Sequence, residues 1–104
     1  MTTAHLEFGI DTFGDLPRDD DGKLLSQAAA IRATVAEAVL ADHIGIDIVA
    51  LGEHHRPEYA ISSPETVLAG IATMTKRIRL SSGVTVLSSD DPVRVFQRFA
   101  TVDA

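Results

Sequence analysis

The stretch Asp47-Ile48-Val49-Ala50-Leu51-Gly52-Glu53-His54-His55-Arg56 joins an apolar run to a cluster of titratable side chains. Residues 47–51 are typical of a buried strand in a parallel sheet, because nearly all of them are aliphatic. A glycine, a glutamate and two histidines follow the strand directly. In α/β proteins, ligands bind at the carboxyl ends of the strands, and catalytic residues lie there too. The stretch therefore indicates a parallel α/β fold with a functional site where this strand ends.

Two further strands are predicted, one earlier in the sequence and one later. Residues 6–10 alternate apolar with small or polar side chains, and residues 78–87 are rich in β-branched side chains. The repeat from the second strand to the third is about 30 residues, which is the size of a βαβ unit.

Three helices are predicted between and after the strands. Apolar residues at helical spacing from Leu24 onward indicate a first helix of about five turns, with His43 in its last turn and Gly45 as its left-handed cap. Ser63-Pro64-Glu65 and Asp91-Pro92 are typical helix starts, with a capping side chain followed by proline. The expected buried stripes of these two helices are Val67, Leu68, Ile71 and Met74, and Val95, Phe96, Phe99 and Val102. We expect Lys76 and Arg77 to lie at the negative end of the second helix.

The predicted order is strand, helix, strand, helix, strand, helix, which implies parallel strands joined by right-handed crossovers. No change of composition divides the chain, so residues 1–104 are expected to form one domain or part of one. The glycine-rich phosphate loops of dinucleotide-binding and P-loop proteins are missing from the sequence.

The overall composition disfavours several classes of function. A formal net charge of −6 disfavours binding to nucleic acid or to anionic membranes. The chain has no cysteine, which excludes disulfides, thiolate nucleophiles and cysteine-ligated zinc. It also contains no apolar run near the roughly 20 residues that span a bilayer, and its start does not resemble a signal peptide. The cytoplasm is the expected location.

Three interpretations of Glu53, His54 and His55 remain open. They could form a structural hydrogen-bonding hub at the end of the strand. They could bind a metal ion, although adjacent residues of a strand point to opposite faces and the usual ligand spacing is absent. They could act in acid–base chemistry, since histidine exchanges protons near neutral pH and a flanking glutamate can fix its tautomer. The alternation implies that one of the two histidines faces the pocket.

The end of the third strand offers a second candidate surface. After Gly83, the segment from Val84 to Ser89 ends in small and polar residues. It could simply be a buried strand that leads into a serine-rich turn. Alternatively, small side chains here would let the backbone approach a flat ligand closely.

Several short segments recur in a familiar order and spacing. These segments are Phe8-Gly9, Gly45 to Asp47, Gly52 to Arg56, Ser63-Pro64, Thr75 to Leu80 with Gly83-Val84, Asp91 to Arg94 and Phe99 to Asp103. Together they resemble the bacterial luciferase-like, flavin-dependent monooxygenase family over essentially the whole chain. Ala50 departs from the pattern, because many relatives have tryptophan there.

The resemblance implies a (β/α)8 TIM barrel with the flavin ring at the carboxyl ends of its strands. His54 matches the family's active-site histidine, which assists the chemistry of the reduced flavin with oxygen, and Glu53 lies beside the ring. A non-prolyl cis peptide packs against the ring and is expected at or near Thr85-Val86. The implied reaction oxidises a small organic substrate with O2 and reduced FMN, supplied by a flavin reductase or by NAD(P)H. Some relatives instead use F420 for hydride transfer, and the family often forms homo-oligomers.

The length of the chain limits these expectations. A barrel of this type needs about 250 residues, whereas this chain has 104 and supplies only the first three βα units. The family's phosphate-binding residues lie further along. We therefore expect an amino-terminal portion that is marginally stable, oligomeric or inactive alone. A non-catalytic α/β fragment and a metal-dependent barrel hydrolase are the alternatives.

Overall fold

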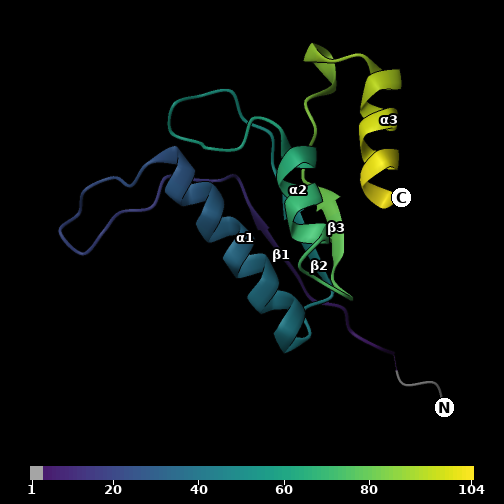
Figure 1. The fold of residues 1–104 in the computed structure, drawn as a ribbon, viewed down its shortest axis with the longest axis horizontal. Helices are drawn as coiled ribbons and strands as arrows, with labels where there is room; N and C mark the ends of the chain where they lie inside the picture. The colour runs from purple at the N-terminus through teal and green to yellow at the C-terminus, as the bar shows by residue number, and fades with distance from the viewer. Residues whose placement is uncertain (1–3) are drawn as a thin grey trace.

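The computed structural model describes residues 4–104. Strands and helices alternate along the chain (Figure 1). The elements are β1 (Gly9–Thr12), α1 (Gln27–Ile44), β2 (Ile48–Leu51), α2 (Pro64–Ala72), β3 (Arg79–Ser82), a 3-10 turn η1 (Leu87–Ser89) and α3 (Pro92–Asp103). The three strands form one parallel sheet in the order β1-β2-β3. The predicted parallel α/β architecture is confirmed.

The two faces of the sheet differ in character. Val49 and Leu51 of β2 are buried beneath α1 and α2, which lie on the same side of the sheet in Figure 1. Ile48 and Ala50 alternate with them and point to the opposite face. In register with Ala50 are Asp11 of β1 and Ser81 of β3, so the helix-free face carries small and polar side chains there.

The hydrophobic core lies between β2 and the first two helices. Its buried members are Ala38, Ala41, Val49, Leu51, Ile61, Leu68, Ile71 and Ile78, and Phe99 and Val102 of α3 pack against their edge. The predicted stripe of α2 is correct for Leu68 and Ile71. It is wrong for Met74, which is exposed because α2 ends at Ala72. It is also wrong for Phe96, whose ring is exposed on α3.

Two strand predictions were wrong in their boundaries. The first strand begins at Gly9 rather than at residue 6, because the Phe8 amide donates to the Asp47 carboxylate (2.8 Å) instead of entering the ladder. The third strand ends at Ser82 rather than at residue 87. Beyond Gly83 the chain turns toward Glu53, whose backbone amide donates to the Val84 carbonyl (3.0 Å).

Helix ends follow the predicted chemistry in part. Gly45 caps α1 with a φ of 90°, and the Asp91 carboxylate accepts from the amides of Val93 and Arg94 at the start of α3. The first helix begins later than expected, because the Ser26 hydroxyl caps it by accepting from Ala29 (3.1 Å). Ser63 precedes α2 without a side-chain cap.

The buried carboxylate of Asp42 ties α1 to the segment before β3. It accepts hydrogen bonds from the amides of Lys76 (3.1 Å), Arg77 (2.9 Å) and Ile78 (2.9 Å). Lys76 and Arg77 therefore lie four and five positions beyond the end of α2 at Ala72, and the expectation that they lie at its negative end is wrong. The hydrogen bonds from Ile78 and Arg77 hold the pKa of Asp42 below its ordinary value, although burial opposes them.

Asp42→Asn is expected to weaken the acid sensitivity of the fold. Because the pKa of Asp42 is lowered on folding, its contribution is complete above the pKa of the unfolded chain, about 3.9, and is lost as the pH falls through the folded value. Urea unfolding at several pH values should therefore show a shallower loss of stability below about pH 4 in the variant. Asp20→Asn, in an exposed loop, is the control. Parallel stability curves for Asp42→Asn and the parent chain would contradict this role.

Candidate functional site

Gly52 is the point where the carboxyl ends of the three strands meet. Its amide donates to the Thr12 carbonyl at the end of β1 (2.9 Å). A Cβ at this position would lie 2.7 Å from Cδ1 of Phe13 and 3.1 Å from the Gly83 carbonyl oxygen. Only glycine therefore lets the ends of β1 and β3 approach β2 so closely.

His54 is half-buried in an aromatic cluster. Its ring centroid lies 4.3 Å from that of Tyr59, with 32° between the ring planes, and 4.7 Å from that of Phe13, at 47°. Its backbone amide donates to the Ile61 carbonyl (2.9 Å). The ring nitrogen Nδ1 is buried and has no hydrogen-bond partner within residues 4–104. Stacking, rather than a carboxylate, orients this imidazole.

The loops after β1 and β2 hold the aromatic cluster together. The Leu16 amide donates to the Glu58 carbonyl (3.1 Å), and the Ala60 amide donates to the Gly14 carbonyl (2.7 Å). This short antiparallel pairing places Tyr59 against His54. Neither Phe13 nor Tyr59 was predicted as a site residue from the sequence. Each is an aromatic residue in a polar loop, but no local pattern shows that the two loops pair.

Glu53 contacts His55 and not His54, so the histidine that the flanking glutamate orients is His55. Its Oε2 lies 2.6 Å from Nε2 of His55, and its Oε1 accepts from the Val86 amide (3.3 Å). The Glu53 side chain is 8% exposed, whereas that of His55 is 55% exposed. Glu53 thus bridges the end of β2 and the segment after β3.

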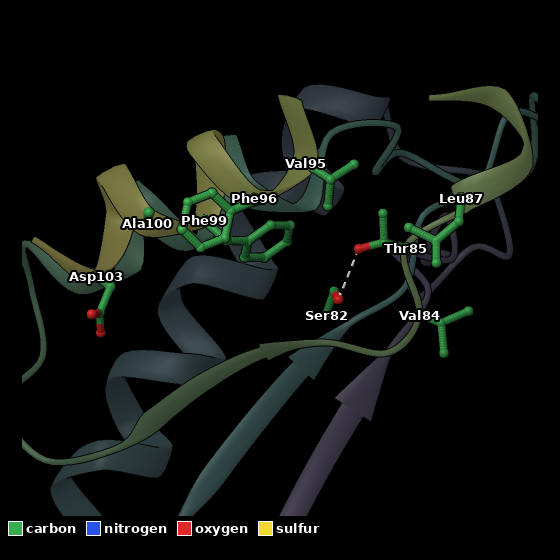
Figure 2. Close-up of a pocket in the computed structure, with 9 residues that line it drawn as sticks. All are labelled: Ser82, Val84, Thr85, Leu87, Val95, Phe96, Phe99, Ala100 and Asp103. Carbon is green, nitrogen blue, oxygen red and sulfur yellow. Dashed lines mark hydrogen bonds between the residues drawn. The ribbon is translucent and has the colours of Figure 1, made fainter. Parts of the chain in front are cut away.

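The cis peptide lies between Gly83 and Val84, two positions before the expected Thr85-Val86 bond. The Thr85 hydroxyl donates to Ser82 Oγ (2.8 Å), and Thr85 lines a cavity of about 770 Å3 beneath α3 (Figure 2). Phe96 and Phe99 of α3 form the opposite wall of this cavity. His54 does not line it. The structure therefore brings Glu53 and Val86 into contact, while Thr85 and His54 lie in separate environments.

A second group of charges lies beside Glu53 and His55. Arg98 of α3 bonds to Asp90, and its Nε lies 3.2 Å from Oε1 of Glu65 in α2. The hydrogen bond with Asp90 raises the pKa of Arg98, and the same bond lowers the pKa of Asp90. These residues share a cavity of about 310 Å3 with Glu53, His55, Ser62, Ser63 and Ser89. Arg98 was not predicted as a site residue from the sequence.

Within residues 4–104, no three histidine, aspartate or glutamate side chains gather closely enough to hold a metal ion. In the same part of the chain, no helix is long and apolar enough to cross a membrane.

Comparison with known proteins identifies the family. Residues 7–104 match the model of the luciferase-like monooxygenases. The chain belongs to the luciferase-like monooxygenase family. Protein y4wF of Sinorhizobium fredii strain NBRC 101917 / NGR234 is 36% identical over 101 residues, which are 96% of this chain and 28% of that protein.

Solved structures agree with this family assignment. Apo-MsnO8 matches 94% of this chain and 29% of its own, with a TM-score of 0.83 and 28% identity. The oxygenating constituent of 3,6-diketocamphane monooxygenase from Pseudomonas putida, a type II Baeyer-Villiger monooxygenase in complex with FMN, matches 94% of this chain and 26% of its own. Its TM-score is 0.77 and its identity 25%. The chain thus spans under a third of the length of these luciferase-like relatives, and its fold is that of the first βα units of their barrel.

Proposed function

We propose that this chain provides the first three βα units of a flavin-dependent monooxygenase. In this proposal, His54 is the catalytic residue, and Glu53, Thr85 and Val86 belong to the flavin site. The observation that supports it best is the setting of His54. Its imidazole stands at the carboxyl end of β2, packs against both Phe13 and Tyr59, and has a buried ring nitrogen with no hydrogen-bond partner among residues 4–104.

The residues at this end of the sheet suit a flat aromatic ring. Ala50 and Ser81 are in register on the helix-free face, and their small side chains leave room there for a planar group. This end of the sheet does not suit a phosphate, because its arginines already have carboxylate partners. Arg56 is paired with Glu58, and Arg98 is paired with Asp90 and Glu65. The phosphate would therefore bind residues outside this part of the chain.

A bound flavin would supply the two-electron redox chemistry and the reaction with oxygen. His54 would hold or move a proton beside the reacting atoms, since histidine does so near neutral pH. Contact with the tilted rings of Phe13 and Tyr59 would keep the imidazole in one orientation during this step. Glu53 would hold the backbone at Val86 in place through its carboxylate.

FMN is the flavin that we favour, because the similar 3,6-diketocamphane monooxygenase component is in complex with FMN. F420 with hydride transfer is the alternative for the same site. A small organic molecule would be the substrate, and a flavin reductase the source of reduced FMN.

The surface of the chain supports a role within a larger barrel. β3 has no strand on its outer side among the described residues, and exposed apolar side chains gather near this edge. They are Val84, Leu87 and Phe96, which line the cavity that also contains Ser82 of β3. Unpaired edges and apolar patches of this kind are normally covered. We therefore propose that the chain is inactive without further βα units.

A flavin titration tests this proposal. The isolated chain should quench FMN fluorescence weakly, because it lacks a phosphate site. A chimera in which residues 7–104 replace the matching part of a luciferase-like relative should bind FMN stoichiometrically and oxidise that relative's substrate. Tight stoichiometric binding by the isolated chain would show that the phosphate argument is wrong. A folded chimera that does not bind flavin would overturn the proposed function.

A further inference from the structure

We infer that His55 is a positioning residue that acts through Glu53 on the backbone of residues 84–86. The two side chains lie 2.6 Å apart, and the same carboxylate accepts from the Val86 amide. Its importance for flavin binding rests on the proposed function, but the linkage itself is a property of the chain alone.

The burial of Glu53 requires a partner for its charge. Its side chain is only 8% exposed, and a buried carboxylate is costly unless it is paired and hydrogen-bonded. His55 fills this role from the solvent side, because its own ring is 55% exposed. A protonated imidazole in contact with the carboxylate forms a charge-assisted hydrogen bond, which is stronger than a neutral one.

Among the described residues, no cation other than His55 is in direct contact with the Glu53 carboxylate. Arg98 faces the same cavity from α3 and interacts with the Glu53 charge at longer range, but its guanidinium is paired with Asp90 and with Glu65 of α2. The remaining charged groups that face the cavity, Glu65 and Asp90, are anionic and would repel an unpaired Glu53 carboxylate.

Glu53 is joined to the segment after β3 by two separate hydrogen bonds. Its backbone amide donates to the Val84 carbonyl (3.0 Å), and its carboxylate accepts from the Val86 amide (3.3 Å). The first bond does not depend on the side chain, whereas the second does. Without His55, the carboxylate would turn toward water, and the Val86 amide would lose its acceptor while Val84 kept its bond.

A double-mutant cycle on the 104-residue chain, followed by NMR of the backbone amides, tests this linkage. His55→Leu should shift the Val86 amide resonance and speed its hydrogen exchange about tenfold, the effect of losing one hydrogen bond to a charged group. The Glu53 amide should change much less. His55→Gln keeps a donor and should restore most of the parent behaviour. In a Glu53→Gln background, which needs no counter-charge, His55→Leu should have little further effect. His5→Leu, at an exposed histidine, is the matched control.

If the His55→Leu substitution unfolds the chain, a pH titration of the parent chain provides a second test. On titration, the Val86 amide shift should follow the imidazole nitrogens of His55 and not those of His54. An unchanged Val86 amide in folded His55→Leu, or an equal effect of His55→Leu in the Glu53→Gln background, would overturn the inference. So would a Val86 shift that follows His54. Flavin is absent from these experiments, so a failure of the proposed flavin site would be seen separately, in the chimera.

Discussion

His54→Ala is expected to slow substrate oxidation by about 10²–10⁴-fold in a barrel completed with the remaining units of a luciferase-like relative. Flavin affinity should change far less. A positioned side chain that transfers a proton in the transition state contributes a factor of this size to the rate. Its removal lowers kcat without removing the contacts that hold the cofactor. The measurements are steady-state rates of substrate oxidation and FMN titration of the same variant.

The expected difference between the effects on oxidation rate and on flavin affinity depends on which residues His54 contacts. Its ring contacts Phe13 and Tyr59, whereas the contacts to the segment after β3 belong to Glu53. Removal of the imidazole therefore leaves the backbone of residues 84–86 with its own hydrogen bonds. In the proposed site, proton transfer and the holding of the cofactor would thus fall to neighbouring residues with separate contacts.

His43→Ala provides the matched control for this experiment. His43 is exposed in the last turn of α1, at the other end of the sheet, so its loss should leave the oxidation rate unchanged. Equal rates for His54→Ala and the parent barrel would remove the catalytic assignment of His54. A parallel loss of rate and flavin affinity would instead assign His54 to cofactor binding.

The sequence predicted the fold well wherever the determinants were local. The caps at Gly45 and Asp91 and the alternation of strands with helices all depend on residues that are close together along the chain. The limits of β3 depend on a distant residue. The strand stops at Ser82 because the following segment bonds to Glu53, and the Glu53–Val86 contact joins positions 33 residues apart. Periodicity within 78–87 does not contain that information.

The candidate site was predictable in position but not in its contacts. The cluster at Glu53, His54 and His55 does follow β2, as the sequence indicates. The partners of each side chain come from other loops, however, and alternation along a strand does not identify them. Asp42 is a further case: it bonds to amides 34–36 residues away, a relation that no local motif signals.

Leu68→Ala is expected to destabilise the chain by about 2–5 kcal/mol, the usual range for deletion of a buried leucine. Leu68 is 1% exposed, and α2, which carries it, packs against α1, α3 and β3. Because alanine is the best helix former, the substitution tests packing rather than helix propensity. Urea unfolding followed by circular dichroism measures the change, with the m-value as a check on two-state behaviour.

Leu40→Ala is the matched control, since Leu40 is also a helical leucine but is 59% exposed on α1. Its effect should stay within about 0.5 kcal/mol, as for most surface substitutions. The contrast matters for more than stability. Leu68 of α2 belongs to the same buried cluster as Ile61, whose carbonyl accepts from the His54 amide. Similar effects for the two variants would mean that α2 is not packed against its neighbours in the isolated chain. The geometry of His54, Glu53 and Val86 would then form only when further βα units complete the barrel.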